Sequence, residues 1–139
     1  MKISVEFVIE VQARAEKLWD VLTDVEAWHG WQGTPFVKLS KPGRIIEGSA
    51  FVAVLGGMKW NLVVTKADRP YKIIWEGRRL GLRAVHEWEF KEEQGKTKAV
   101  TRENMTGWLL ILTYPIARQR LAEADEKWLA DLKTTAERS

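Results

Sequence analysis

The sequence of 139 residues contains no cysteine, and this absence removes several classes of protein at once. Without thiols the chain can form no disulfide, offer no thiolate to zinc and use no cysteine nucleophile. A chain without cysteine is compatible with a reducing compartment, and we expect a cytoplasmic location.

Histidine is almost as scarce, with His29 and His86 the two present. Neither is spaced from an aspartate or glutamate as in known metal-site motifs, and no serine lies in a nucleophile elbow. We therefore expect no metal and no other cofactor. The longest apolar run, residues 108–117, is too short to span a bilayer, so no integral membrane segment is expected. An alternating strand pattern begins at once, which argues against a signal peptide.

The chain also has no large excess of positive or negative charge. The net charge of +3 is spread along the chain, so we expect no nucleic-acid partner. The length fits one domain, residues 1–139, with one hydrophobic core, and a monomer or a homodimer is expected. Tryptophan, in contrast, is abundant. Eight tryptophans must be buried or must line a cavity, because so many exposed indoles would cause aggregation.

Two-residue alternation predicts that strands make up most of the first hundred residues. The predicted strands are residues 2–11, 36–39, 51–55, 58–67, 71–77, 82–91 and 97–106. Gly56-Gly57 between two apolar runs predicts a tight hairpin. Helical spacing at residues 13–23 and 25–30 predicts two short helices after the first strand.

The last thirty residues follow a helical period. Apolar residues recur at steps of three and four from Leu110 to Leu132, which predicts one long amphipathic helix over residues 107–139. Pro115 interrupts this pattern, so we expect the helix to start or bend there and residues 108–113 to be separately movable. A long helix with a wide apolar stripe requires a concave sheet to pack against.

Several short sequence segments occur in the same order in a known superfamily. They are Ala15 to Trp28, Asp68-Arg69-Pro70, Ile73 to Gly77, His86-Glu87-Trp88-Glu89-Phe90, and Glu103 to Gly107. With the order of elements, they make the chain resemble the helix-grip (START-like, SRPBCC) superfamily, in its bacterial polyketide cyclase-like branch. The resemblance implies an α+β helix-grip fold. In that fold a curved antiparallel sheet of about six to seven strands wraps around the long C-terminal helix and encloses a hydrophobic pocket.

The pocket implied by this fold would be lined by the inward faces of the strands and the inner stripe of the helix. The expected lining residues are Trp28, Trp31, Phe51, Trp60, Leu62, Ile73, Trp75, Ala84, His86, Trp88, Thr101, Glu103, Met105, Tyr114 and Leu121. Broad, rigid aromatic side chains with few polar partners suit a flat apolar or aromatic ligand. The hydroxyl of Tyr114 could reach such a ligand, although tyrosines at such positions commonly only pack.

His86 and Glu103 are the candidate chemical groups. Strict alternation turns His86 inward, and folding the next strand back brings Thr101 and Glu103 near it. A histidine and a carboxylate within an apolar cavity could act as a general acid and base. The alternative is that they satisfy each other as a structural polar pair.

Three classes of function remain open on the sequence alone. The favoured class is a module that binds a small hydrophobic molecule such as a lipid or a polyketide-like compound. The second is a polyketide cyclase, aromatase or dehydratase that uses His86 and Glu103 without a metal. The third is a protein-interaction module, which predicts that Leu109, Leu112 and Ile116 form an exposed patch.

Overall fold

The computed structural model describes residues 1–138, and its elements confirm the predicted α+β helix-grip fold. The elements in chain order are β1 (Lys2–Val11), α1 (Ala15–Thr23), the 3-10 helix η1 (Val25–Ala27), α2 (Trp28–Trp31), β2 (Val37–Leu39), β3 (Ala50–Leu55), β4 (Met58–Asp68), β5 (Lys72–Arg79), β6 (Leu82–Glu93), β7 (Lys96–Thr106) and α3 (Leu109–Glu137). The second predicted short helix is thus two shorter pieces, η1 and α2.

All seven strands form one antiparallel sheet in the order β1-β7-β6-β5-β4-β3-β2. Strands β2 to β7 are joined as a meander, and β1 pairs with β7 at the far edge. The register of β6 and β7 sets His86 directly opposite Glu103, and β5 sets Trp75 opposite His86. Strict alternation then turns all three side chains to the same face of the sheet.

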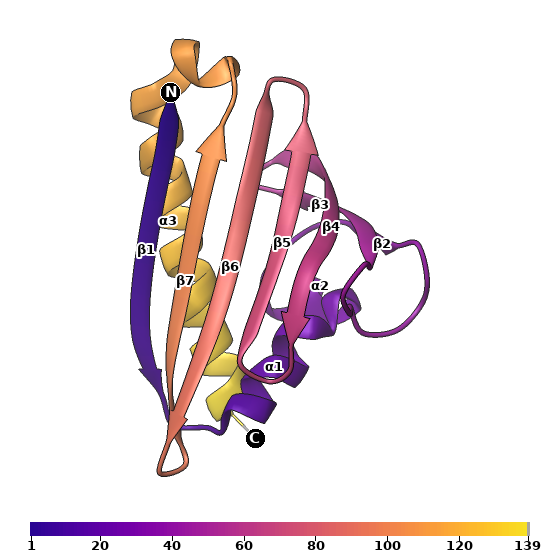
Figure 1. The fold of residues 1–139 in the computed structure, drawn as a ribbon, viewed down its shortest axis with the longest axis vertical. Coiled ribbons are helices and arrows are strands. Elements are labelled where there is room, and N and C mark those ends of the chain that lie inside the picture. Colours follow the sequence, from indigo (N-terminus) through magenta and orange to yellow (C-terminus); the bar gives the residue numbers. More distant parts are fainter. Residues whose placement is uncertain (139) are drawn as a thin grey trace.

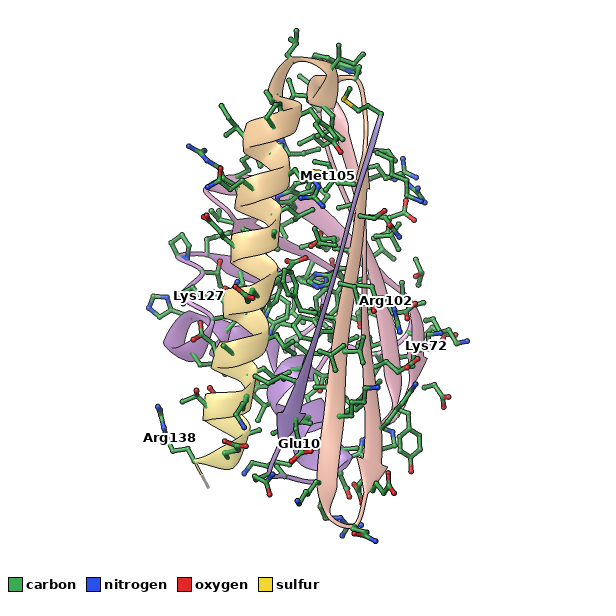
Figure 2. The ribbon with its side chains drawn as sticks, turned by 90° about the vertical axis from the view of Figure 1, so that its left-hand side faces the viewer. Glu10, Lys72, Arg102, Met105, Lys127 and Arg138 are labelled. Atoms are coloured by element: carbon green, nitrogen blue, oxygen red, sulfur yellow. The ribbon has the colours of Figure 1, made fainter. Side chains whose placement is uncertain are left out.

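Helix α3 covers that face (Figure 1). In the view turned by 90°, side chains lie in a layer between α3 and the sheet, while Lys127 and Arg138 lie on the far side of the helix (Figure 2). From α3 the residues Leu110, Trp128, Leu129 and Leu132 are buried in this layer. Within residues 1–138, no helix combines the length and apolarity needed to cross a membrane.

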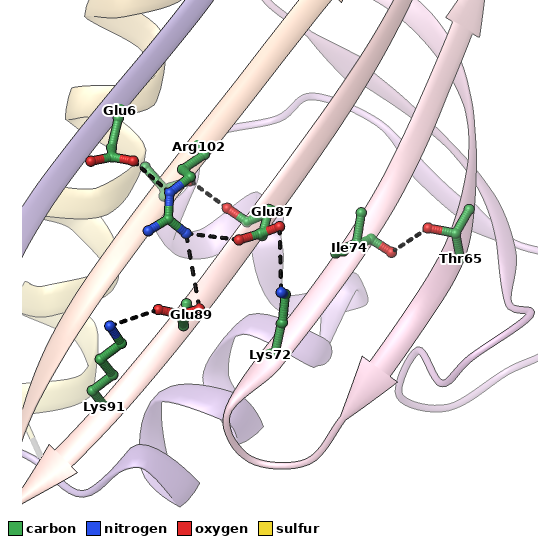
Figure 3. A network of polar contacts seen from close by, with 9 residues as sticks. Glu6, Thr65, Lys72, Ile74, Glu87, Glu89, Lys91 and Arg102 are labelled. Carbon is green, nitrogen blue, oxygen red and sulfur yellow. Dashed lines mark hydrogen bonds and ion pairs between the residues drawn. The ribbon is translucent and has the colours of Figure 1, made fainter.

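The outer face of the sheet is polar instead. Arg102 on β7 forms ion pairs with Glu6 on β1 and with Glu87 on β6, and Glu87 also pairs with Lys72 on β5 (Figure 3). These charges are partly solvated, and such surface pairs usually contribute less than about 1 kcal/mol each. Their placement fixes which face of the sheet is solvent-exposed, so the opposite face is left for α3.

Pro115 lies inside α3, so the helix does not start at this residue. Its first turn precedes the proline, and the hydroxyl of Thr113 donates to the carbonyl of Leu109 at 2.9 Å. Proline cannot donate a backbone hydrogen bond, so the carbonyl of Ile111 lacks its usual helical partner. Ile111 itself is exposed.

A close backbone contact positions the start of α3. Gly107 has a φ of +137°, and a Cβ added there would lie 2.1 Å from the carbonyl oxygen of Gly81 in the β5–β6 turn. That same carbonyl accepts a hydrogen bond from the backbone N–H of Leu109 at 3.2 Å. The absence of a side chain at Gly107 thus lets the helix begin directly against the β5–β6 turn.

Gly107→Ala should therefore destabilise the protein by roughly 2–4 kcal/mol, because both the backbone conformation and the contact with Gly81 must change. Gly95→Ala is the matched control, since Gly95 also has a positive φ of +79° but has open space around it. Its cost should be about 1 kcal/mol. Urea denaturation measures both, and equal losses for the two variants would contradict the contact argument.

Candidate functional site

A cavity of about 550 Å³ lies between the sheet and the first two-thirds of α3. Its walls are mainly apolar, with a group of acidic and imidazole side chains on one side. The lining residues include Leu55, Met58, Trp60, Leu62, Trp75, Leu82, Ala84, His86, Glu103, Met105, Leu110, Thr113, Ala117, Arg120, Leu121, Ala124, Asp125 and Trp128. A volume of this size suits a ligand of drug-like dimensions.

Eight of the fifteen residues expected to line a pocket do line this cavity. They are Trp60, Leu62, Trp75, Ala84, His86, Glu103, Met105 and Leu121. The other seven lie outside its lining: Trp28, Trp31, Phe51, Ile73, Trp88, Thr101 and Tyr114. Trp31 and Tyr114 are half-buried and pack against the core, and the remaining five are buried.

The difference arises because part of the sheet face is filled by aromatic packing. Trp128 of α3 contacts Trp28 at a ring-centroid distance of 5.0 Å and Trp88 at 5.5 Å. Trp28 also contacts Phe51 at 5.7 Å, and its indole N–H donates to the carbonyl of Leu22 at 2.9 Å. These side chains form a packed cluster, so Trp28 is part of the core and does not line the pocket as expected.

His86 is enclosed by this cluster. Its ring stacks on Trp88 at 4.9 Å and meets Trp128 edge-on at 5.2 Å, and only 2% of the residue is exposed. Burial lowers the pKa of His86 from 6.5, against an opposing effect from the nearby charge of Asp125. The imidazole is therefore neutral at neutral pH.

Thr101 orients the imidazole. Its hydroxyl lies 2.7 Å from Nε2 of His86 and 3.3 Å from the carbonyl of Glu87. Because a hydroxyl has one proton, donation to the carbonyl leaves an oxygen lone pair to accept from Nε2–H. In that arrangement Nδ1 carries a free lone pair, and it lies 3.4 Å from Oε1 of Glu103.

Glu103 and Asp125 form a buried acidic pair. Glu103 is 9% exposed and Asp125 is 2% exposed. Burial, the charge of Asp125 and a hydrogen bond to Asp125 together raise the pKa of Glu103 well above 4.5. The protonated form of Glu103 is therefore favoured, and Oδ2 of Asp125 has no hydrogen-bond partner.

Asp125 is the residue that the sequence analysis missed. The helical stripe was read through Leu121, Ala124 and Trp128, and Asp125 lies four residues after Leu121 and three before Trp128. That spacing puts it on the same face of the helix. An aspartate on an otherwise apolar helix face was the available signal.

The outer rim of the cavity carries exposed apolar side chains. Leu112 and Ile116 are 76% and 62% exposed, whereas Leu109 is half-buried. Leu109 and Ile116 both line the cavity. The patch predicted for a protein-interaction module is therefore present at two of its three positions. Trp108 and Ile111 are exposed beside them.

Comparison with known proteins identifies relatives of this fold. The sequence profile described as "Polyketide cyclase / dehydrase and lipid transport" matches residues 2–137. No curated protein sequence matches the chain.

Solved structures with the same fold share little sequence with the chain. A hypothetical protein from Helicobacter pylori superposes with a TM-score of 0.82 at 14% identity, covering 98% of this chain and 88% of that one. A START superfamily protein from Mycobacterium smegmatis gives a TM-score of 0.78 at 14% identity and covers 96% and 97%. The Zhui aromatase/cyclase from Streptomyces gives a TM-score of 0.77 at 20% identity and covers 99% and 95%.

The raised pKa of Glu103 predicts a pH-dependent stability. The folded protein retains the Glu103 proton to a higher pH than the unfolded chain does. The stabilisation that results is complete below about pH 4.5 and is lost as the pH rises toward the folded pKa. The variant Glu103→Gln has no carboxyl group at this position, so it does not lose this stability as the pH rises. Its unfolding free energy relative to wild type should therefore increase by more than about 1 kcal/mol between about pH 5 and about pH 8.

Urea denaturation across this range, with a chelator present, measures the effect. Glu126→Gln, an exposed change on α3, is the control and should show no trend with pH. His86 acts in the opposite direction, because its lowered pKa makes stability fall as the pH drops below 6.5. A constant difference between Glu103→Gln and wild type would contradict the buried-acid assignment.

Proposed function

The chain belongs to the polyketide cyclase, dehydrase and lipid-transport family, and we propose that it binds a small hydrophobic or aromatic molecule, such as a lipid or a polyketide-like compound, in the cavity beneath α3. The family's description spans enzymes and carriers, so membership alone does not choose between them. The choice depends on the cavity.

The cavity itself is the observation that carries the proposal. It retains about 550 Å³ although eight tryptophans are available to fill the interior. Trp60, Trp75 and Trp128 contribute rings to its wall, and Gly77 on β5 leaves the wall without a side chain. Flat surfaces of this kind favour a ligand with an extended apolar or aromatic body.

Three of the polar side chains that line this cavity form one cluster. His86, Glu103 and Asp125 give a ligand one place at which to form hydrogen bonds, and the rest of the described wall is mostly apolar. Such an arrangement orients an amphipathic molecule, with its polar end at the acidic pair. Arg120 on α3 also lines the cavity and is exposed at the surface.

Binding can be tested with a substitution that fills the cavity. Ala117 lines it from α3 and is half-exposed, so Ala117→Phe can place a ring in the cavity with little disturbance of the core. We expect at least about a tenfold loss of affinity for anilinonaphthalene sulfonate, equivalent to about 1.4 kcal/mol. Fluorescence titration, with energy transfer from the cavity tryptophans, provides the measurement.

Ala130→Phe is the matched control, because Ala130 is on the same helix, is exposed and does not line the cavity. It should bind the dye as wild type does. Native mass spectrometry of freshly purified protein should also reveal a bound apolar molecule that Ala117→Phe lacks. Equal binding by both variants, with no bound molecule, would overturn the proposal.

A second candidate is an enzyme that closes or dehydrates a polyketide-like chain. The observation that favours it is the position of His86, Glu103 and Asp125 on the cavity wall. Neutral His86 can accept a proton at Nδ1, and protonated Glu103 can donate one to a developing alkoxide or to a leaving hydroxyl. The mutual distance of 3.4 Å between the two groups allows one substrate to contact both.

If the protein is an enzyme, replacing either candidate catalytic residue should lower the reaction rate much more than it lowers ligand binding. His86→Leu and Glu103→Leu should each slow the cyclisation of a linear poly-β-ketone thioester by about 100-fold, because general acid–base catalysis contributes effects of this size. Binding of the dye should change much less. Product analysis by chromatography measures the rate, and unchanged rates in both folded variants would exclude the enzymatic candidate while leaving the binding proposal intact.

A further inference from the structure

His86, Glu103 and Asp125 converge although they lie far apart in the sequence. One ligand atom from each, an imidazole nitrogen or a carboxylate oxygen, lies within 4.8 Å of the other two. The ligand atoms of a tetrahedral zinc ion are about 3.4 Å apart, because zinc bonds to nitrogen and oxygen are about 2.0–2.2 Å long. The distance between Nδ1 of His86 and Oε1 of Glu103 is 3.4 Å.

The two carboxyl groups of the cluster favour the binding of a cation. Two buried carboxyl groups in contact are destabilising unless a proton or a cation neutralises them. The ion pairs of residues 1–138 give neither Glu103 nor Asp125 a lysine or arginine partner. Oδ2 of Asp125 is buried and has no hydrogen-bond partner.

The surroundings of His86 match those of a metal-bound histidine. Such histidines usually donate the second ring N–H to an oxygen acceptor, which fixes the tautomer and directs the free nitrogen at the metal. Here Nε2 contacts the hydroxyl of Thr101 at 2.7 Å, and this hydroxyl lies 3.3 Å from the carbonyl of Glu87. Nδ1 is then the free nitrogen, and it faces Glu103.

We propose that His86, Glu103 and Asp125 form a binding site for one divalent transition-metal ion, with zinc as the best match, on the wall of the cavity. Two carboxylates and a neutral imidazole balance the charge of the ion. Three protein ligands with a fourth position open to the cavity is the arrangement typical of a zinc ion that contacts a small molecule. Mg²⁺ and Ca²⁺ fit less well, because they require about six oxygen ligands.

The three ligands come from positions 86, 103 and 125 on β6, β7 and α3 and follow no metal-binding motif, so the sequence analysis expected no metal although it paired His86 with Glu103. The site shares the cavity with the proposed hydrophobic ligand but does not rest on that proposal. Zinc binding and dye binding are measured separately, so the failure of one leaves the other standing.

Isothermal titration of chelator-treated protein with zinc chloride tests the site. We expect one ion per chain, bound with the release of about one proton, because a carboxyl group must lose its proton to bind the metal. Titrations in buffers with different heats of ionisation count that proton. Cobalt(II) should bind at the same site and give the visible absorption of a four- or five-coordinate ion.

Variants identify the ligands. Asp125→Asn and Glu103→Gln should each weaken zinc binding at least about 100-fold, and Thr101→Val should weaken it about 10-fold through the orientation of His86. His29→Asn and Glu126→Gln are the controls, being exposed changes of matching type, and should bind as wild type does. Thermal denaturation verifies that each variant is folded.

Three results would overturn the proposal. One is the absence of saturable binding of one zinc ion per folded wild-type chain. Another is binding that survives Asp125→Asn and Glu103→Gln but is lost in His29→Asn. The third is binding of a lipophilic amine such as dodecylammonium through Asp125 while zinc does not bind, which would make the cluster an ammonium site.

Discussion

Trp128 is the contact on which the arrangement of helix and sheet depends. From the middle of α3 its indole reaches Trp28 on α2, Trp75 on β5 and Trp88 on β6, with ring-centroid distances between 5.0 and 5.8 Å. Aromatic pairs of this geometry contribute roughly 0.5–1.5 kcal/mol each beyond the burial of their area. One side chain therefore joins three separate segments, and it sets how far α3 stands from the sheet at the closed end of the cavity.

The same contact explains why the polar cluster behaves as it does. Trp128 and Trp88 shield His86 from water, so the imidazole stays neutral. One turn before Trp128, Asp125 is carried into the same dry space and meets Glu103. Desolvation is the largest cause of the altered pKa of both His86 and Glu103. The chemistry of the cluster is thus a product of aromatic packing rather than of any one acidic residue.

Periodicity allowed much of this structure to be predicted. The alternation around His86 identified its inward face, and the short loop after β6 put Glu103 on the neighbouring strand, where the register has the two residues opposite each other. The order of helices and strands, together with the sequence segments shared with the superfamily, predicted the helix-grip fold. These features are local in origin, since they depend on side chains two residues apart and on turns of a few residues.

What could not be predicted is the position along the sheet at which each side chain meets helix α3. Alternation states that Trp75 and Trp88 share a face, but it does not state that Trp75 lines the cavity while Trp88 is buried below it. That distinction depends on where along the sheet α3 comes closest. Asp125 was missed for a related reason, because its significance appears only when the helix is placed against Glu103.

The acidic pair has its two halves on different parts of the molecule. Glu103 belongs to the sheet and Asp125 to the helix, so the pair exists only while α3 is docked. Separating the helix from the sheet would remove the burial and the neighbouring Asp125 that raise the pKa of Glu103. The acidity of Glu103 therefore depends on the docking of a helix that is remote from it in the sequence.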